Sequence, residues 1–217
     1  MSIIGFIGGT GPEGKGLGLR MAMAGHEVII GSRDSLRATN AANDIKELTN
    51  TKLIIKGADN KQTATESEIV FITVPYEGHQ NTLIDLKSEL SGKIVVDTVV
   101  PLKVSKGNFE SIEVPSGSAA EEAFINLPNS HVIGAFHNVS AVELLKPTTS
   151  VDCDVIITGN NSESKNIIMQ LAEGINGIRA VDGGRIENTK QIEDLTILLL
   201  NINKIYKKHS MIKIVGL

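Results

Sequence analysis

A glycine-rich turn near the start of the chain constrains its fold more than any other feature. Residues 9–14 read Gly-Thr-Gly-Pro-Glu-Gly, which matches the pattern G-x-G-x-x-G, and they directly follow the apolar stretch Ile3–Ile7. A stretch of helical period, expected over Gly14–Ala24, comes next. A strand, this turn and then a helix form the context in which the pattern binds phosphates. The segment therefore predicts dinucleotide binding, with an ordinary structural turn as the alternative.

Each glycine of the turn has a separate mechanical task. Gly9 permits the tight turn, Gly11 lets a pyrophosphate approach the backbone, and Gly14 lets the helix lie close to the strand. The free N–H groups at the start of the helix then face the phosphates. The predicted cofactor-binding residues of this turn are Gly9, Thr10, Gly11, Pro12, Glu13 and Gly14.

The second strand ends on residues suited to an extra phosphate. An NAD enzyme places an acidic residue there for the ribose 2′-hydroxyl, whereas this chain has Ser32 and Arg33, with Arg37 one helical turn further on. A hydroxyl and a guanidinium bind a 2′-phosphate that a carboxylate would repel. The sequence thus predicts NADP(H). In the alternative interpretation both arginines are solvated and Asp34 contacts the ribose.

Short β-branched apolar runs alternate with stretches of helical period, which is typical of βαβ units. We expect an α/β fold, a Rossmann-type doubly wound and mainly parallel sheet with a small C-terminal α/β appendage. The expected strands are Ile3–Ile7, Glu27–Ile30, Leu53–Lys56, Ile69–Val74, Ile94–Asp97, Val132–Ala135, Val155–Thr158 and Ile178–Asp182. The expected helices are Gly14–Ala24, Ser35–Leu48, His79–Leu90, Ala119–Ile125, Ser164–Glu173 and Ile192–Ile205. We predict an NADP(H)-binding domain over 1–150 and a small domain over 151–217 that packs directly onto it.

Composition argues against several classes of partner. A net charge of −4 and the lack of Trp disfavour nucleic acid. The single cysteine, Cys153, excludes an internal disulfide, and the five histidines do not cluster like metal ligands, so a reducing, cytoplasmic setting and no metal are expected. No apolar run approaches membrane-spanning length, and the N-terminus predicts a strand rather than a targeting segment.

A second reactant is expected beyond the carboxyl ends of the strands, where ligands bind in open α/β sheets. The segments there are 74–77, 98–101 and 137–141. Tyr76 offers a stacking face or is a rim residue, and His137 is either a general acid or structural. Cys153 is expected to be a buried small hydrophobe. The pairs Glu121-Glu122 and Lys207-Lys208 are expected to be solvated helix charges.

No acid/base pair stands out in these segments. Reduction of a ketone or imine usually needs a proton donor, whereas transfer between two cofactors mainly needs aligned rings. The sequence therefore favours hydride transfer between cofactors.

Several segments in order along the chain carry a family resemblance. They are Gly8-Gly9-Thr10-Gly11, Gly14-Lys15-Gly16-Leu17, Gly25-His26-Glu27-Val28, Gly31-Ser32-Arg33, Val74-Pro75-Tyr76-Glu77, Lys93-Ile94-Val95-Val96 with Pro101, Asp182-Gly183-Gly184, Leu195-Thr196 and Leu199-Leu200-Asn201-Ile202. On these segments the chain resembles the NADPH-dependent reductases of the deazaflavin coenzyme F420. Two positions depart from the family pattern: the family usually has Trp where this chain has Tyr76, and Pro where it has Ser140.

The resemblance implies a homodimer in which F420 is the second substrate and its ring stacks on the nicotinamide. The C-terminal domain would then serve the substrate and dimerisation. Carried over by position, the phosphates are held by residues 10–13, Ser32, Arg33 and Arg37, and the dinucleotide is lined by Val74, Pro75, Gly78, Val100 and the backbone of Ala141. The implied substrate-binding residues are His137, Ser140, Ser210 and Met211. A flavin or ferric reductase of the same fold and a non-catalytic NADPH sensor remain the alternatives. A hydroxy-acid or imino-acid reductase is disfavoured, because those classes use a large helical second domain and only about 65 residues follow the nucleotide domain.

Overall fold

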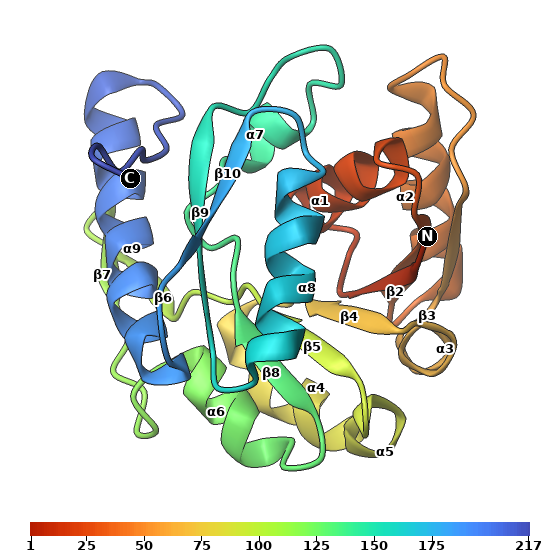
Figure 1. Ribbon diagram of the computed structural model, residues 1–217, viewed down its shortest axis with the longest axis horizontal. Coiled ribbons are helices and arrows are strands. Elements are labelled where there is room, and N and C mark those ends of the chain that lie inside the picture. Colours follow the sequence, from red (N-terminus) through yellow and green to blue (C-terminus); the bar gives the residue numbers. More distant parts are fainter.

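The computed structural model describes all 217 residues as three layers, with one large sheet between two sets of helices (Figure 1). The strands of the sheet are β1 (Ile3–Ile7), β2 (Glu27–Ser32), β3 (Ile55–Asp59), β4 (Ile69–Ile72), β5 (Ile94–Asp97), β8 (His131–Gly134), β9 (Cys153–Gly159) and β10 (Ile178–Asp182). A separate hairpin consists of β6 (Leu102–Ser105) and β7 (Asn108–Ser111).

Nine α-helices and two short 3₁₀ turns connect the strands. The helices are α1 (Pro12–Met23), α2 (Ser35–Glu47), α3 (Asn60–Glu66), α4 (His79–Asp85), α5 (Lys87–Leu90), α6 (Ala119–Asn126), α7 (Ala141–Leu144), α8 (Ser162–Glu173) and α9 (Thr189–Tyr206). The 3₁₀ turns are η1 (Tyr76–Gly78) and η2 (Ile186–Asn188). Along the long axis of the molecule, α9 lies at one end and α2 at the other (Figure 1).

The large sheet confirms the predicted fold class. Its strand order is β10-β9-β8-β5-β4-β1-β2-β3, and only the pair β8 and β9 is antiparallel. The six strands from β3 to β8 in this order run in one direction, so their carboxyl ends meet at one edge. Ligands bind at this edge in open α/β sheets.

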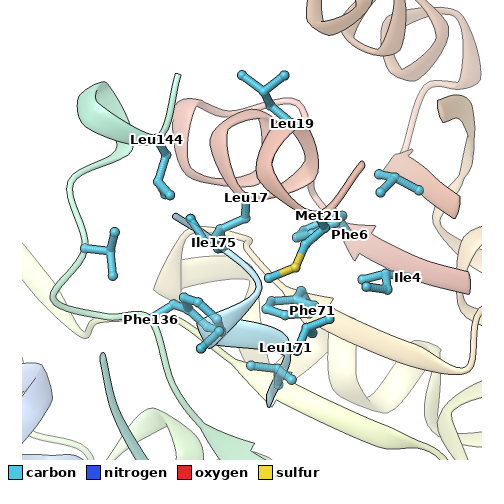
Figure 2. Packing of buried hydrophobic residues seen from close by; sticks show 14 of the residues in the cluster. Ile4, Phe6, Leu17, Leu19, Met21, Phe71, Phe136, Leu144, Leu171 and Ile175 are labelled. Atoms are coloured by element: carbon cyan, nitrogen blue, oxygen red, sulfur yellow. The ribbon is translucent and has the colours of Figure 1, made fainter. Parts of the chain in front are cut away.

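Two hydrophobic clusters bury the two faces of the sheet. The larger contains 31 residues and packs α1, α2 and α8 against one face, while α3, α4 and α6 supply helical residues to the 15-residue cluster on the other. Figure 2 shows the aromatic centre of the larger cluster, where the ring centroids of Phe6 and Phe71 lie 4.8 Å apart and those of Phe71 and Phe136 lie 5.6 Å apart. The three rings come from β1, β4 and the turn after β8, so their contacts hold the middle strands of the sheet together.

The C-terminal part of the chain continues this sheet. Strands β9 and β10 extend it beyond β8, and Val155 and Leu171 belong to the same cluster as Ile4 and Phe6. Buried Cys153 lies in this cluster, as the sequence predicted. The predicted boundary at residue 150 therefore falls within one continuous sheet and one hydrophobic cluster, and the division into two domains stays a prediction that the folding of residues 1–150 alone would test.

Most predicted elements differ from the observed ones by one to three residues at an end, and two of the differences have a clear physical cause. The third strand covers Ile55–Asp59 instead of Leu53–Lys56, because pairing with β2 begins opposite Val28 at Ile55 while Leu53 packs into the core without pairing. The helix predicted over His79–Leu90 is broken at Leu86, whose φ of −107° and ψ of 9° are not helical.

Helices α3 and α7 and the hairpin of β6 and β7 were absent from the prediction. Helix α3 has little apolar periodicity, although the Asp59 side chain caps it by accepting a hydrogen bond from the N–H of Gln62 at 2.8 Å. The hairpin of β6 and β7 turns at Lys106 and Gly107, which both have positive φ, as a two-residue type I′ turn requires. Helix α7 spans only four residues.

No helix combines the length and the apolar character that crossing a bilayer requires.

Candidate functional site

One large cavity lies at the edge where the parallel strands end. Its volume is about 1300 Å³, and its walls come from the turn after β1, the ends of β2, β4, β5 and β8, helix α9 and the tail that follows it. All but two of the eighteen predicted site residues line it, the exceptions being Gly9 and Met211. The structure thus gathers residues from nearly the whole length of the chain.

The glycine turn at the start of the cavity is shaped by contacts within the protein. A Cβ on Gly14 would lie 2.5 Å from the Cα of Gly9, and one on Gly9 would lie 2.8 Å from the carbonyl oxygen of Phe6. A Cβ on Gly11, in contrast, would meet no atom within 4 Å. Gly9 and Gly14 therefore serve the close approach of α1 to β1, whereas the open space at Gly11 fits a phosphate that approaches the backbone.

Glu13 is the unusual side chain of this turn. Its Oε1 atom is buried without a hydrogen-bond partner, and burial raises the pKa of the carboxyl to about 8. The side chain is therefore largely neutral at pH 7 and does not oppose a bound phosphate.

The end of β2 presents cations to the cavity. Arg33 and Arg37 are exposed, both line the cavity, and neither forms an ion pair within the protein. The Ser32 hydroxyl accepts the N–H of Asp34 at 3.2 Å, and Asp34 caps α2 by accepting the N–H groups of Leu36 and Arg37 at 2.9 and 3.2 Å. Both capping bonds use Oδ1 of Asp34, which itself lines the cavity, so the 2′-phosphate interpretation rests on the two unpaired guanidinium groups beside it.

The exits of β4 and β5 form the middle of the cavity wall. The hydroxyls of Thr73 and Thr98 donate to the carbonyls of Ile7 and Ile72, each at 2.9 Å, which ties each exit to the neighbouring strand. The residues that follow these two threonines in the chain line the cavity, namely Val74, Pro75, Gly78 and Val100.

His137 lies in the wall at the end of β8. It follows Phe136, which has a left-handed φ of 65°, the residue is only 6% exposed, and neither ring nitrogen has a hydrogen-bond partner. Burial lowers the pKa of His137 to about 4 despite the opposing charge of Asp97, so the ring is neutral at pH 7. A neutral imidazole can donate one hydrogen bond and accept another, but it is a poor general acid.

Helix α7 presents Ser140 and Ala141 to the cavity. The Ser140 hydroxyl caps the helix by accepting the N–H of Glu143 at 3.3 Å. Buried Arg20 of α1 donates to the carbonyls of Leu144 at 2.8 Å and Glu143 at 3.0 Å, which anchors the far end of α7. Since Gly14 and Arg20 belong to the same helix, α1 connects the phosphate turn with this wall.

The chain after α9 contributes His209 to the cavity wall and, next to it, Ser210. Its N–H and hydroxyl both donate to Asn203 Oδ1 at 2.6 Å, and both residues line the cavity. Met211 packs against the larger core cluster instead.

Sequence reasoning missed part of the wall and a buried cluster behind it. Asn60 lines the cavity but belongs to no segment that the sequence singled out, whereas Asn138, Thr196 and Leu199 lie in such segments but were not predicted as site residues. The expectation that Glu122 is solvated was wrong, because its Oε1 lies 2.8 Å from Nδ1 of buried His79. The exposure of Lys207 and Lys208 agrees with the prediction.

The fold and the site together define a Rossmann-type dinucleotide-binding protein. A family model described as "NADP oxidoreductase coenzyme F420-dependent" matches residues 3–101, and the chain is 42% identical over 205 residues to the F420-dependent NADP reductase of Methanothermobacter marburgensis, covering 92% of both chains. The chain therefore belongs to the F420-dependent NADP reductase family.

Two further comparisons agree with this assignment. The F420-dependent NADP reductase of Methanocaldococcus jannaschii is 40% identical over 209 residues, covering 94% of this chain and 93% of the relative. A crystal structure from Arthrobacter sp. FB24, described as a putative F420-dependent NADP reductase, superimposes with a TM-score of 0.84 over 99% of both chains. At 23% identity that structure supports the fold alone.

Proposed function

We propose that this protein is an oxidoreductase that exchanges a hydride between NADP(H) and coenzyme F420. The continuous cavity carries the proposal, because one space of about 1300 Å³ extends from the phosphate turn to His137 and α9. Pockets for one small ligand usually measure about 300–1,000 Å³. A space above that range accommodates a dinucleotide and a second ring system, which a non-catalytic NADPH sensor does not need.

One end of the cavity is assigned to NADP(H). The turn at residues 10–14 would hold the pyrophosphate through its backbone N–H groups, which only Pro12 lacks, and Ser32, Arg33 and Arg37 would bind the 2′-phosphate. Val74, Pro75, Gly78, Val100 and Ala141 line the remaining part of the dinucleotide site. When bound, NADP(H) supplies or accepts the hydride, so the protein's task is to hold the two rings in line.

The other end is assigned to the second substrate. His137, Ser140 and Ser210 line this end, and Ser210 comes from the segment that follows α9. Since His137 is neutral at pH 7, we assign it hydrogen bonding to the substrate and not proton donation. We assign Met211 a supporting role: it packs against the larger core cluster and so holds the segment that carries Ser210.

A homodimer and a cytoplasmic setting complete the proposal. Support for the first is the family resemblance, and support for the second is the single buried cysteine. Light scattering of the purified protein would test the dimer.

The function is tested by following NADPH oxidation by the purified protein with F420, with a free flavin in parallel and NADH as the nucleotide control. Turnover with F420 and NADPH is expected, with little from NADH. Turnover with the flavin alone would instead indicate a flavin or ferric reductase, and binding of NADPH without turnover would indicate a sensor.

A further inference from the structure

A buried charged cluster lies directly behind the cavity wall. His79, the first residue of α4, places its Nε2 atom 2.6 Å from Oδ2 of Asp97 in β5 and its Nδ1 atom 2.8 Å from Oε1 of Glu122 in α6. The side chains of His79 and Asp97 are fully buried. The cluster thus joins α4, β5 and α6 through two fully buried side chains and one that is partly exposed.

The charges of this cluster favour a protonated histidine. Burial opposes the charge on His79, but the Asp97 and Glu122 carboxylates outweigh it and raise its pKa to about 9. Both ring nitrogens then donate, one to each carboxylate. Two other titratable groups face the cluster: Glu193 of α9, whose pKa is raised to about 8 by burial and by Asp97, and Tyr76, whose ring centroid lies 6.1 Å from that of His79.

Asp97 connects this cluster to the cavity. Its Oδ2 atom binds His79, while its Oδ1 atom accepts the N–H of Val99 at 3.0 Å. Val99 and Tyr76 both line the cavity, although His79 and Asp97 do not. A rotation of the Asp97 carboxylate would therefore disturb its hydrogen bond to Val99, which is part of the cavity wall.

Stability alone does not explain such a cluster. Burying charges costs desolvation energy, and replacing a buried ion pair by well-packed apolar residues is often neutral or stabilising. An ionic arrangement that fixes one carboxylate orientation is suited to holding a neighbouring backbone segment in place.

We propose that His79 is a positioning residue for the hydride exchange: held by Glu122, it fixes Asp97 so that the turn at residues 98–100 keeps its place in the cavity wall. This inference rests on the proposed function. It assigns a role to a histidine that touches neither substrate.

A matched pair of substitutions separates the two contacts of His79. In His79→Gln the amide nitrogen takes the place of Nε2 and keeps the Asp97 contact, whereas in His79→Asn it takes the place of Nδ1 and keeps only the Glu122 contact. Both remove the charge. We expect His79→Asn to lower kcat by about tenfold or more with KM for NADPH changed by less than about threefold, and His79→Gln to retain most of kcat.

A measurement without substrate accompanies the kinetics. Hydrogen–deuterium exchange at the Val99 amide of the free protein is expected to be faster in His79→Asn than in His79→Gln. The control is Asp154→Asn, which removes a buried carboxylate paired with Arg179 at 2.5 Å on β9, outside the cavity lining. It should lower the thermal midpoint but leave kcat and Val99 exchange unchanged.

Equal kcat and equal Val99 exchange in the two His79 variants would overturn the inference, as would a KM that rises in step with the loss of kcat. If His79→Asn does not fold, Asp97→Ala and Asp97→Asn make the same comparison, because only asparagine keeps an oxygen for the Val99 N–H. Faster exchange and lower kcat in Asp97→Ala alone would support the inference, and equal values would refute it. A wild-type protein inactive with F420 would refute the proposed function, whatever the exchange data show.

Discussion

Two arginines without partners distinguish the residues at the end of β2. Arg33 and Arg37 are exposed beside the buried Ser32, while one oxygen of the nearby Asp34 carboxylate caps α2. An unpaired guanidinium retains its full capacity to bind a phosphate in bidentate fashion. The preference for NADP(H) over NAD(H) is therefore assigned to Ser32 and the two arginines.

Replacing Ser32 and Arg33 by alanine should weaken NADPH far more than NADH. A lost hydrogen bond to a charged group costs about 1.5–3 kcal/mol, and NADH has no phosphate at this position to lose. Titration of both nucleotides by fluorescence measures the difference. Equal weakening of the two would contradict the 2′-phosphate assignment.

Buried titratable residues make stability depend on pH. His79, with a pKa of about 9, and Glu13 and Glu193, with pKa values of about 8, all bind protons more tightly in the folded state than in the unfolded state. Their contribution is fully present below the unfolded pKa values and is lost as pH rises through the folded ones. His137, whose pKa is lowered to about 4, acts in the opposite direction but only below its ordinary value of 6.5.

The thermal midpoint should consequently fall as pH rises from 6.5 to 9, since over this window all three raised groups lose their contribution. Differential scanning calorimetry in buffers of constant ionic strength provides the test. A midpoint that stays constant or rises over this window would show that these groups are not held as described.

At the scale of elements, the phosphate turn and α1 form one unit. Gly9 and Gly14 let α1 approach β1, and Arg20 near its other end holds α7. The open space at Gly11 has no such packing role. One helix thus positions both the turn and a more distant part of the cavity wall.

Alanine at Gly11 and at Gly14 should therefore have different effects. Gly14→Ala forces a Cβ against the backbone of Gly9 and should lower stability by about 1–3 kcal/mol. Gly11→Ala should leave the thermal midpoint unchanged and weaken NADPH, because its Cβ enters the space assigned to the pyrophosphate. Wild-type NADPH affinity in Gly11→Ala would contradict that assignment.

The sequence revealed elements with a strong pattern and missed those without one. The glycine turn, β5 and β10 were predicted with correct bounds or nearly so, because apolar runs and glycine punctuation identify them. Helix α3 is short and polar, so its sequence shows no apolar periodicity that would predict a helix. The contact of Glu122 with His79 was equally invisible, because the two residues are 43 positions apart and only the packing of α4 on α6 joins them.

At the scale of the whole molecule, the cavity depends on both ends of the chain. The turn after β1 supplies one end of it, and α9 with its tail supplies another wall. Strands β9 and β10 place α9 there by extending the sheet past β8. This arrangement explains how a chain of 217 residues provides a site for two reactants without a large second domain.

A fragment of residues 1–150 should not fold cooperatively. It would lose Val155, Leu171 and other members of the larger core cluster and would leave β8 as an unpaired edge. Circular dichroism during heating, with the full chain as reference, tests this expectation. A sharp transition in the fragment would instead support an independently folding first domain.

Direct hydride exchange within this single cavity is the central claim, and isotope transfer tests it most directly. NADPH carrying deuterium at the transferable position of nicotinamide C4 is mixed with F420 and the protein, and the reduced F420 is analysed by mass spectrometry. Direct exchange predicts that the product retains the deuterium, because the hydride passes between the rings without meeting solvent. Unlabelled product, with the deuterium in water, would contradict the account.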